Sequence, residues 1–187
     1  MPRAKSSPRH VALLRGINVG GHNKLPMATL RQMFADLGAS EVETYIQSGN
    51  VVFAGPAKLV RQLPVSLSAA IADELGLTVP VVVRSGASLA ELVAGGHPFA
   101  DQIAEPKLRM VGFCDKAPSA AKRAAFDPAS RSPDDFAELR GAEVFLGFPN
   151  GSGRSKLDVA WLDRSLGVVS TWRNWLTVEK LAEMAGA

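Results

Sequence analysis

Two stretches of this chain show the same order of predicted elements, and that order limits the possible fold more than any other feature. The expected elements of the first half are a strand at 11–14, a helix at 26–37, a hairpin at 44–54, a helix that ends at Leu75 and a strand at 79–84. This order is typical of a ferredoxin-like βαββαβ sandwich, in which two helices cover one face of a four-stranded antiparallel sheet. Pro64 interrupts the second helical pattern, which allows residues 59–63 to form a separate turn.

The second half repeats this order less clearly. Its expected elements are a short helix at 88–94, a strand at 108–114, a helix at 119–126, a hairpin at 136–148, a helix at 155–166, an extended segment at 168–171 and a final helix at 175–185. The hairpins share Gly, Val and Phe in register between 49–53 and 141–145, which indicates a duplication, although strands of common composition would also match by chance. We therefore expect an α+β protein of two ferredoxin-like units, with lobes at 10–85 and 86–187.

The composition fits a folded protein and excludes several classes. Hydrophobic residues make up 47% of the 187 positions, and the formal net charge of +3 permits an anionic partner without requiring one. Cys114 is the only cysteine, which excludes an intrachain disulfide and fits a reducing compartment. No apolar run reaches the ~18 residues that a membrane span needs, so no membrane contact is expected. We interpret residues 1–9 as a flexible basic tail on a cytoplasmic protein of undetermined oligomeric state.

Each half carries a glycine-rich basic turn between a strand and a helix, at 15–26 and at 149–156. Glycine and asparagine allow positive φ, and a helix N-terminus adds unpaired N–H groups and a partial positive charge. Such turns can hold a phosphate or carboxylate. The alternative is that they are plain turns whose polar residues cap helices, with Ser155 as an N-cap. The candidate ligand-binding residues of the two turns are Arg15, Asn18, Asn23, Lys24, Arg154, Ser155 and Lys156.

Two further polar clusters are candidates. The hairpin turn offers Gln47, Ser48 and Asn50, but Ser-Gly between two strands is also an ordinary turn. We expect this hairpin to lie at the pole of the sheet opposite the loop that follows the first strand. Near the C-terminus, Arg173 and Asn174 stand between two tryptophans, a mixture suited to phosphate contact and stacking. The alternative there is that Asn174 caps the last helix and only Arg173 can reach a ligand.

The sequence contains no recognisable catalytic or cofactor motif. Walker, G-x-G-x-x-G, G-x-S-x-G and H-E-x-x-H patterns are all missing, and His10, His22 and His97 lie far apart. We therefore predict no metal site, no cofactor and no catalytic residue, and the sequence leaves open whether the protein is an enzyme.

Several of these strings resemble a bacterial family known as domain of unknown function 1697. The strings are LLRGINVGG at 13–21, NK at 23–24, YIQSGNVVF at 45–53, GRSKL at 153–157 and RNW at 173–175. The resemblance runs from about Val11 to the C-terminus. The resemblance implies a two-lobed α+β protein of ferredoxin-like units, but it supplies no reaction. The polar positions of the family's motifs coincide with the candidate residues named above. Members of the family usually carry lysine where His22 stands, threonine where Trp172 stands and asparagine where Leu176 stands.

Three functional hypotheses remain. The first is binding of a phosphate-bearing anion, such as nucleic acid or a nucleotide, in a cleft lined by both glycine-rich loops. The second is an enzyme that acts on a phosphorylated or carboxylate small molecule. The third is a protein-interaction module whose polar motifs only hold the structure together.

Overall fold

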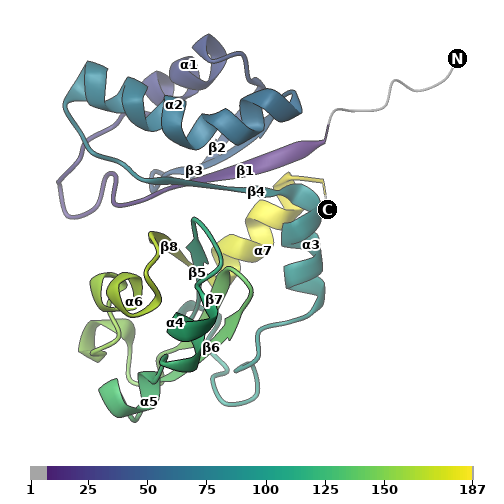
Figure 1. Cartoon of the computed structure of the whole chain (residues 1–187). Coiled ribbons are helices and arrows are strands. Elements are labelled where there is room, and N and C mark those ends of the chain that lie inside the picture. The colour runs from purple at the N-terminus through teal and green to yellow at the C-terminus, as the bar shows by residue number, and fades with distance from the viewer. Residues whose placement is uncertain (1–7, 187) are drawn as a thin grey trace, which may run out of the picture. The chain divides into compact units, whose positions relative to one another are not determined.

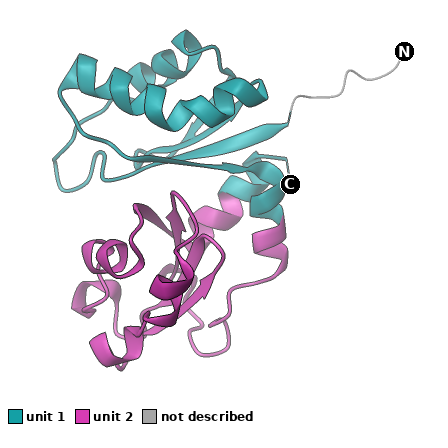
Figure 2. Ribbon diagram, in the orientation of Figure 1, with its two compact units in different colours: residues 1–90, 181–187 teal, residues 91–180 magenta. Residues whose placement is uncertain are grey.

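The computed structural model of the chain describes residues 8–186, which divide into two compact units. Unit 1 contains the described residues as far as Ala90 together with the C-terminal residues from Leu181, and unit 2 is Glu91–Lys180 (Figure 2). Each unit is built on its own four-stranded antiparallel sheet (Figure 1). The strand orders are equivalent, which confirms two similar α+β units of ferredoxin-like type.

Unit 1 has the βαββαβ order expected from the sequence. Its elements are β1 (Arg9–Leu14), α1 (Met27–Asp36), β2 (Ser40–Tyr45), β3 (Asn50–Ala54), α2 (Ala57–Leu75) and β4 (Val81–Ser85). The sheet order is β2-β3-β1-β4, with every neighbouring pair antiparallel. Both helices cover the same face of this sheet (Figure 1), where Phe34 of α1 meets Phe53 of β3 at a ring separation of 5.3 Å. Both phenylalanines are fully buried, so this contact lies at the centre of the core.

Helix α2 is continuous through Pro64, so the separate turn that the sequence allowed at 59–63 does not form. Leu63, Leu67 and Ile71 recur at a spacing of four residues and are all fully buried. Their burial holds the helix on both sides of the proline and offsets the one backbone hydrogen bond that proline removes.

Unit 2 repeats the arrangement with shorter helices. Its elements are the end of α3 (Gly86–Ala94), the 3₁₀ turn η1 (Pro106–Leu108), β5 (Arg109–Cys114), α4 (Ala120–Ala124), α5 (Pro128–Arg131), β6 (Phe136–Arg140), β7 (Glu143–Gly147), the 3₁₀ turn η2 (Ser152–Arg154), α6 (Val159–Leu166), β8 (Ser170–Asn174) and the beginning of α7 (Trp175–Met184). The sheet order β6-β7-β5-β8 matches that of unit 1. Leu146, Phe148, Leu162 and Leu166 are fully or almost fully buried in its core.

Three boundaries differ from the sequence expectation for local reasons. Helix α6 begins at Val159 rather than Ser155, because Asp158 is the N-cap and accepts a 2.7 Å hydrogen bond from the Trp161 N–H. Strand β8 continues to Asn174, because Arg173 and its neighbours pair with β5. Helix α4 begins at Ala120 rather than Ser119, because Ser119 is its N-cap and accepts a 3.3 Å hydrogen bond from the Lys122 N–H, and it ends at Ala124.

Most of the predicted basic tail, residues 1–7, lies outside the described residues. Arg9, which was assigned to that tail, is instead the first residue of β1. Its guanidinium contacts the Glu43 carboxylate and donates a 2.7 Å hydrogen bond to the Met184 carbonyl, so it ties the strand to the C-terminal segment of unit 1. Within residues 8–186, no helix is both long enough and apolar enough to cross a membrane.

Candidate functional site

The loop between β1 and α1 is held in shape by Asn18. This residue lies at φ +54°, and its side-chain amide donates to the carbonyls of Leu25 (2.9 Å) and Gln47 (2.8 Å). Its side-chain oxygen accepts a 2.9 Å hydrogen bond from the Leu25 N–H. The donors of this amide are therefore both used within the protein, and Asn18 positions the loop rather than offering its side chain to a ligand.

The hairpin turn between β2 and β3 lies beside this loop, so the expectation that it lies at the opposite pole was wrong. Leu13 of β1 pairs with Asn50 of β3, and the Leu14 N–H donates to the Gly49 carbonyl at 2.8 Å. Strand β3 runs antiparallel to both β1 and β2. The C-terminal end of β1 and the turn that enters β3 therefore lie at the same end of the sheet.

The hairpin turn is closed by its own side chains. Asn50 is fully buried, and its amide donates to the Tyr45 carbonyl (3.2 Å) and the Ser48 hydroxyl (3.0 Å). Gly49 lies at φ +78°, where an added Cβ would stand 2.7 Å from the Leu14 Cβ. Gln47, by contrast, is exposed. Of the turn's three candidate residues, only Gln47 presents an exposed side chain.

A cavity of about 520 Å³ lies where the loop, the hairpin turn and the start of α1 meet. Its lining residues are Asn18, Gly21, Lys24, Leu25, Pro26, Met27 and Gln47. Lys24 is exposed, and no carboxylate lines this space. Pro26 is the N-cap of α1 and supplies no side-chain cap, and the first turn of the helix carries no acidic residue. The N–H groups of the first helical turn therefore lack the side-chain acceptor that usually satisfies them.

The second glycine-rich loop borders a smaller cavity, of about 280 Å³, with different chemistry. Its lining residues are Ser132, Asp134, Asp135, Asn150, Gly151, Arg154 and Ser155. One Asp135 oxygen accepts hydrogen bonds from the hydroxyls of Ser132 (2.5 Å) and Ser155 (2.6 Å), while the Ser155 hydroxyl accepts from the Leu157 N–H at 2.8 Å. Ser155 thus holds the loop together instead of capping α6.

Asp135 is the residue of this loop that sequence reasoning missed. The sequence around Asp135 is typical of an ordinary turn. In the structure, the Asp135 carboxylate joins the segment before β6 to the loop before α6. The available signal was the Ser132-Pro-Asp-Asp135 string, in which a serine and an aspartate stand close enough for a local hydrogen bond.

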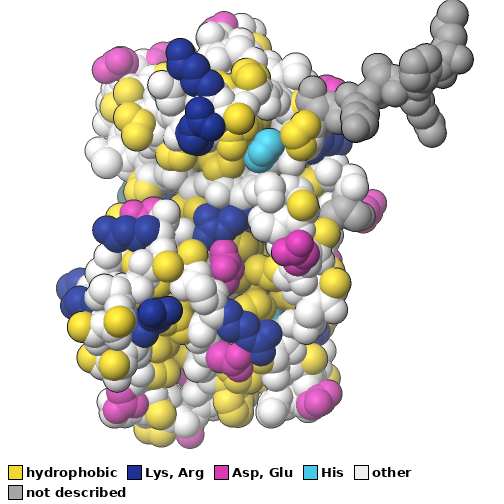
Figure 3. Space-filling view, turned by 45° about the vertical axis from the view of Figure 1, so that its right-hand side comes forward, with side chains coloured by type: hydrophobic (Ala, Val, Ile, Leu, Met, Phe, Trp, Pro, Cys, Tyr) yellow, Lys and Arg dark blue, Asp and Glu magenta, His cyan; other side chains and the backbone are white. Residues whose placement is uncertain are grey.

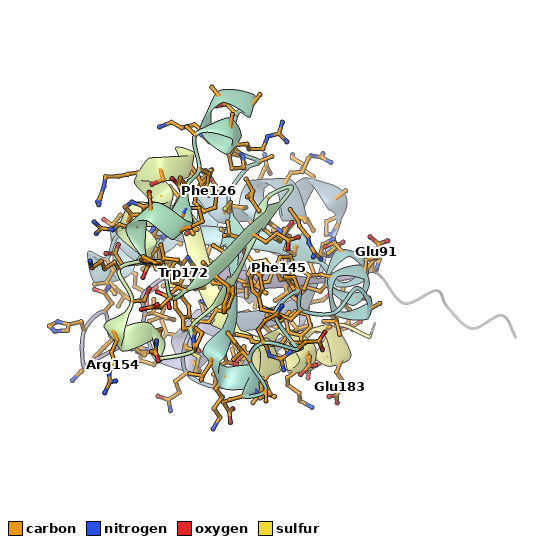
Figure 4. All side chains as sticks on the ribbon, turned by 90° about the horizontal axis from the view of Figure 1, so that it is seen from below. Glu91, Phe126, Phe145, Arg154, Trp172 and Glu183 are labelled. Carbon is orange, nitrogen blue, oxygen red and sulfur yellow. The ribbon has the colours of Figure 1, made fainter. Side chains whose placement is uncertain are left out.

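The basic residues of this second loop are exposed. Figure 4 shows Arg154 at the periphery of the molecule, whereas Trp172 and Phe145 lie over the sheet of unit 2. The Lys156 carbonyl accepts a 3.1 Å hydrogen bond from the Arg131 guanidinium, and its side chain does not line the cavity. Arg154 is the single cation among the lining residues and stands with two carboxylates, which oppose the capture of an anion.

The Arg173-Asn174 pair belongs to the framework of unit 2. Arg173 is only 8% exposed and donates 2.8 Å hydrogen bonds to the Thr171 hydroxyl and the Trp172 carbonyl. Burial lowers the pKa of its guanidinium to about 10. Asn174 accepts a 2.9 Å hydrogen bond from the Thr177 N–H at the start of α7, the capping role given above as the alternative. Neither residue lines one of the two cavities.

Arg15 and Asn23 of the first loop both take part in hydrogen bonds within unit 1. Arg15 is half-buried, and its N–H donates to the Pro80 carbonyl at 3.0 Å. Asn23 lies at φ +49°, and its amide donates to the Gly16 carbonyl at 3.0 Å. The candidates with exposed, uncommitted side chains are therefore Lys24 and Gln47 in unit 1, and Arg154 and Lys156 in unit 2.

Comparison with known proteins identifies the family. The model of the family described as "Protein of unknown function (DUF1697)" matches residues 8–145. The chain belongs to this family. The match contains the loop and the hairpin turn around the cavity of unit 1, whereas the GRSKL and RNW strings lie beyond it.

The fold of this chain is also seen in a solved structure, that of the conserved bacterial protein SP0830 from Streptococcus pneumoniae. The two chains are 24% identical and superpose with a TM-score of 0.71, over 95% of this chain and 98% of the other. This likeness establishes the fold. A search of curated proteins found no match.

Two histidines of this DUF1697 chain have lowered pKa values. Burial lowers the pKa of His97, although its ring contacts the Met110 carbonyl at 3.1 Å, and burial also lowers that of His10. Neither histidine is among the residues that line the two cavities described above. In the described part of the chain, no three His, Cys, Asp or Glu side chains are grouped as metal ligands.

Proposed function

We propose that unit 1 binds a phosphate-bearing anion in the cavity between the β1–α1 loop, the hairpin turn and the start of α1. The observation that carries this proposal is the pairing of an uncapped N-terminus of α1 with Lys24 in a space that no carboxylate lines. Unpaired N–H groups and the helix dipole attract a negative group, and a lysine ammonium adds a full charge.

The equivalent loop of unit 2 provides an internal comparison. There Asp158 already caps α6, and Asp134 and Asp135 line the adjoining cavity. An anion at that position would meet satisfied N–H groups and negative charge. The proposal therefore places the ligand on unit 1, and the hypothesis that both loops line one cleft stays a prediction.

A single phosphate group, such as that of a mononucleotide, fits the cavity better than a nucleic-acid strand does. Lys24 is the one cation that lines it, and nucleic-acid affinity depends on neutralising several phosphates. On the face shown in Figure 3, lysine and arginine side chains are interspersed with acidic ones instead of forming a continuous stripe. Exposed Gln47 supplies a directional hydrogen bond beside the charge.

An enzymatic role is less well supported by the same geometry. General acid or base catalysis usually employs a titratable group whose environment shifts its pKa. His10, His97 and Arg173 have shifted pKa values, and none of the three lines either of these cavities. Ligand binding is therefore the function that these side chains support best.

The test is an NMR titration of the full chain with inorganic phosphate and, separately, with adenosine monophosphate. We expect both probes to shift the amide signals of Met27, Ala28 and Thr29 in the first turn of α1. Lys24→Ala should weaken binding by about tenfold or more, because a hydrogen bond to a charged group contributes roughly 1.5–3 kcal/mol. Lys156→Ala removes an equally exposed lysine from the second loop and should leave affinity unchanged.

Two results would contradict the proposal. One is saturation by phosphate without any shift at the start of α1, and the other is an equal loss of affinity in the two lysine variants. A single-stranded oligonucleotide serves as a third probe. If its affinity falls much more steeply with salt than that of the mononucleotide, several phosphates are bound and the single-phosphate assignment is wrong.

A further inference from the structure

Asn150 differs from every other asparagine of the chain in its surroundings. The side chains of Asn18, Asn23, Asn50 and Asn174 all take part in hydrogen bonds that hold a turn or cap a helix. Asn150 is exposed in the turn that follows β7, and its side chain has no hydrogen-bond partner among residues 8–186. It is also the only asparagine in the sequence that is followed by glycine.

The backbone around Asn150 is open to rearrangement. Gly151 lies at φ +85°, and no atom stands within 4 Å of the place where its Cβ would be. Its N–H donates a single 2.9 Å hydrogen bond to the Phe148 carbonyl within the exposed turn. Exposed turns open locally at a low free-energy cost. This hydrogen bond therefore only partly prevents the Gly151 nitrogen from approaching the Asn150 Cγ.

We propose that Asn150 is a site of spontaneous deamidation. The Gly151 nitrogen gives up its proton to solvent base and bonds to the Asn150 Cγ, while the Cγ–Nδ2 bond breaks and ammonia leaves with a proton from solvent. The product is a five-membered cyclic imide. One water molecule then opens either carbonyl of the imide, which gives aspartate or isoaspartate at position 150. No oxidant or reductant takes part.

The change would alter the electrostatics of the second glycine-rich loop. The cavity there already contains Asp134 and Asp135 beside the guanidinium of Arg154. Deamidation adds a third carboxylate to this lining and lowers the formal net charge of the chain by one from +3. The isoaspartate product also lengthens the backbone of the turn by one methylene. The loop would thus become more acidic as the protein ages, independently of any ligand in unit 1.

The experiment is incubation of the full chain at neutral and at mildly alkaline pH, followed by peptide mapping with mass spectrometry. We expect the mass gain of an amide-to-acid exchange in the peptide that contains Asn150, with separate aspartate and isoaspartate forms. The gain should be faster at the higher pH because solvent base removes the Gly151 proton. The other four asparagines of the same sample are internal controls and should remain intact.

Two variants make the test specific. Gly151→Ala should slow the conversion about tenfold, because a Cβ restricts the backbone conformations that bring the nitrogen to Cγ. Gly153→Ala changes a glycine of the same loop that does not follow an asparagine and should leave the rate unchanged. Far-ultraviolet circular dichroism checks that each variant is folded. A third variant, Asn150→Gln, should abolish the mass gain in the peptide that contains position 150. The proposal is overturned if Asn150 stays intact while another asparagine converts, or if both glycine variants react at the original rate.

Discussion

Gly49→Ala tests directly whether the hairpin turn packs against the end of β1. The substitution places a Cβ 2.7 Å from the Leu14 Cβ and 3.1 Å from both the Ile17 Cγ1 and the Leu14 carbonyl oxygen. Leu14 and Ile17 are fully buried, so they have little room to move aside. The glycine also lies at φ +78°, a conformation that alanine adopts at a cost.

The expected loss of stability follows from these two terms. The left-handed backbone costs alanine roughly 1–2 kcal/mol, and overpacking of a filled core costs roughly 1–3 kcal/mol more. Gly49→Ala should therefore lower the free energy of unfolding by about 2–5 kcal/mol. Gly21→Ala is the matched control, since Gly21 lies at φ +81° with no atom within 4 Å of an added Cβ. It should cost only about 1–2 kcal/mol, the backbone term alone.

The assay must report on unit 1. All three tryptophans, Trp161, Trp172 and Trp175, lie in unit 2, so tryptophan fluorescence would follow the wrong part of the chain. Hydrogen exchange of the β1 and β3 amides, measured by mass spectrometry across a urea series, is local to the contact. Equal losses of protection in the Gly49→Ala and Gly21→Ala variants would refute the close packing of the hairpin turn against β1.

Three further predictions concern single side chains. Asn18→Ala removes hydrogen bonds to Leu25 and Gln47 and should destabilise unit 1 by about 1–3 kcal/mol, measured by urea denaturation; no change would contradict its structural role. Asp135→Asn should increase hydrogen exchange at 150–157, because a neutral amide is a weaker acceptor for the two serine hydroxyls, and unchanged exchange would show that they do not depend on it. His97 has a pKa below 6.5 in the folded state, so the unfolded chain binds a proton first and stability should fall as pH drops below about 6.5. Comparing urea midpoints with those of His97→Gln checks this, and identical pH profiles would count against the buried neutral ring.

The fold was largely predictable because its determinants are local. Apolar strands such as the one ending at Leu14, and helices with buried residues at helical spacing, identified the βαββαβ order in both halves. The predicted helix boundaries were wrong where individual neighbouring residues determine the start or the continuity of a helix. Asp158 starts α6 in place of Ser155, and the buried residues around Pro64 keep α2 continuous.

The candidate site was only partly predictable, because polar side chains in a sequence do not reveal their partners. Asn18 and Asn50 were predicted to contact a ligand, but their side chains make hydrogen bonds to backbone groups across the loop and the turn. Burial of Arg173 depends on the pairing of β8 with β5, a long-range contact that no local pattern signals. The position of the hairpin turn follows from the βαββαβ order itself, in which β1 and β2 run parallel, so the expectation of opposite poles misapplied a fold that was correctly predicted.

Anion binding by unit 1 is tested most directly by soaking a crystal of the full chain in tungstate, a phosphate analogue with strong anomalous scattering. We expect an anomalous peak in the cavity of unit 1, within hydrogen-bonding reach of the Lys24 ammonium and the first N–H groups of α1. A peak beside Arg154 in the loop of unit 2, with none near Lys24, would contradict it.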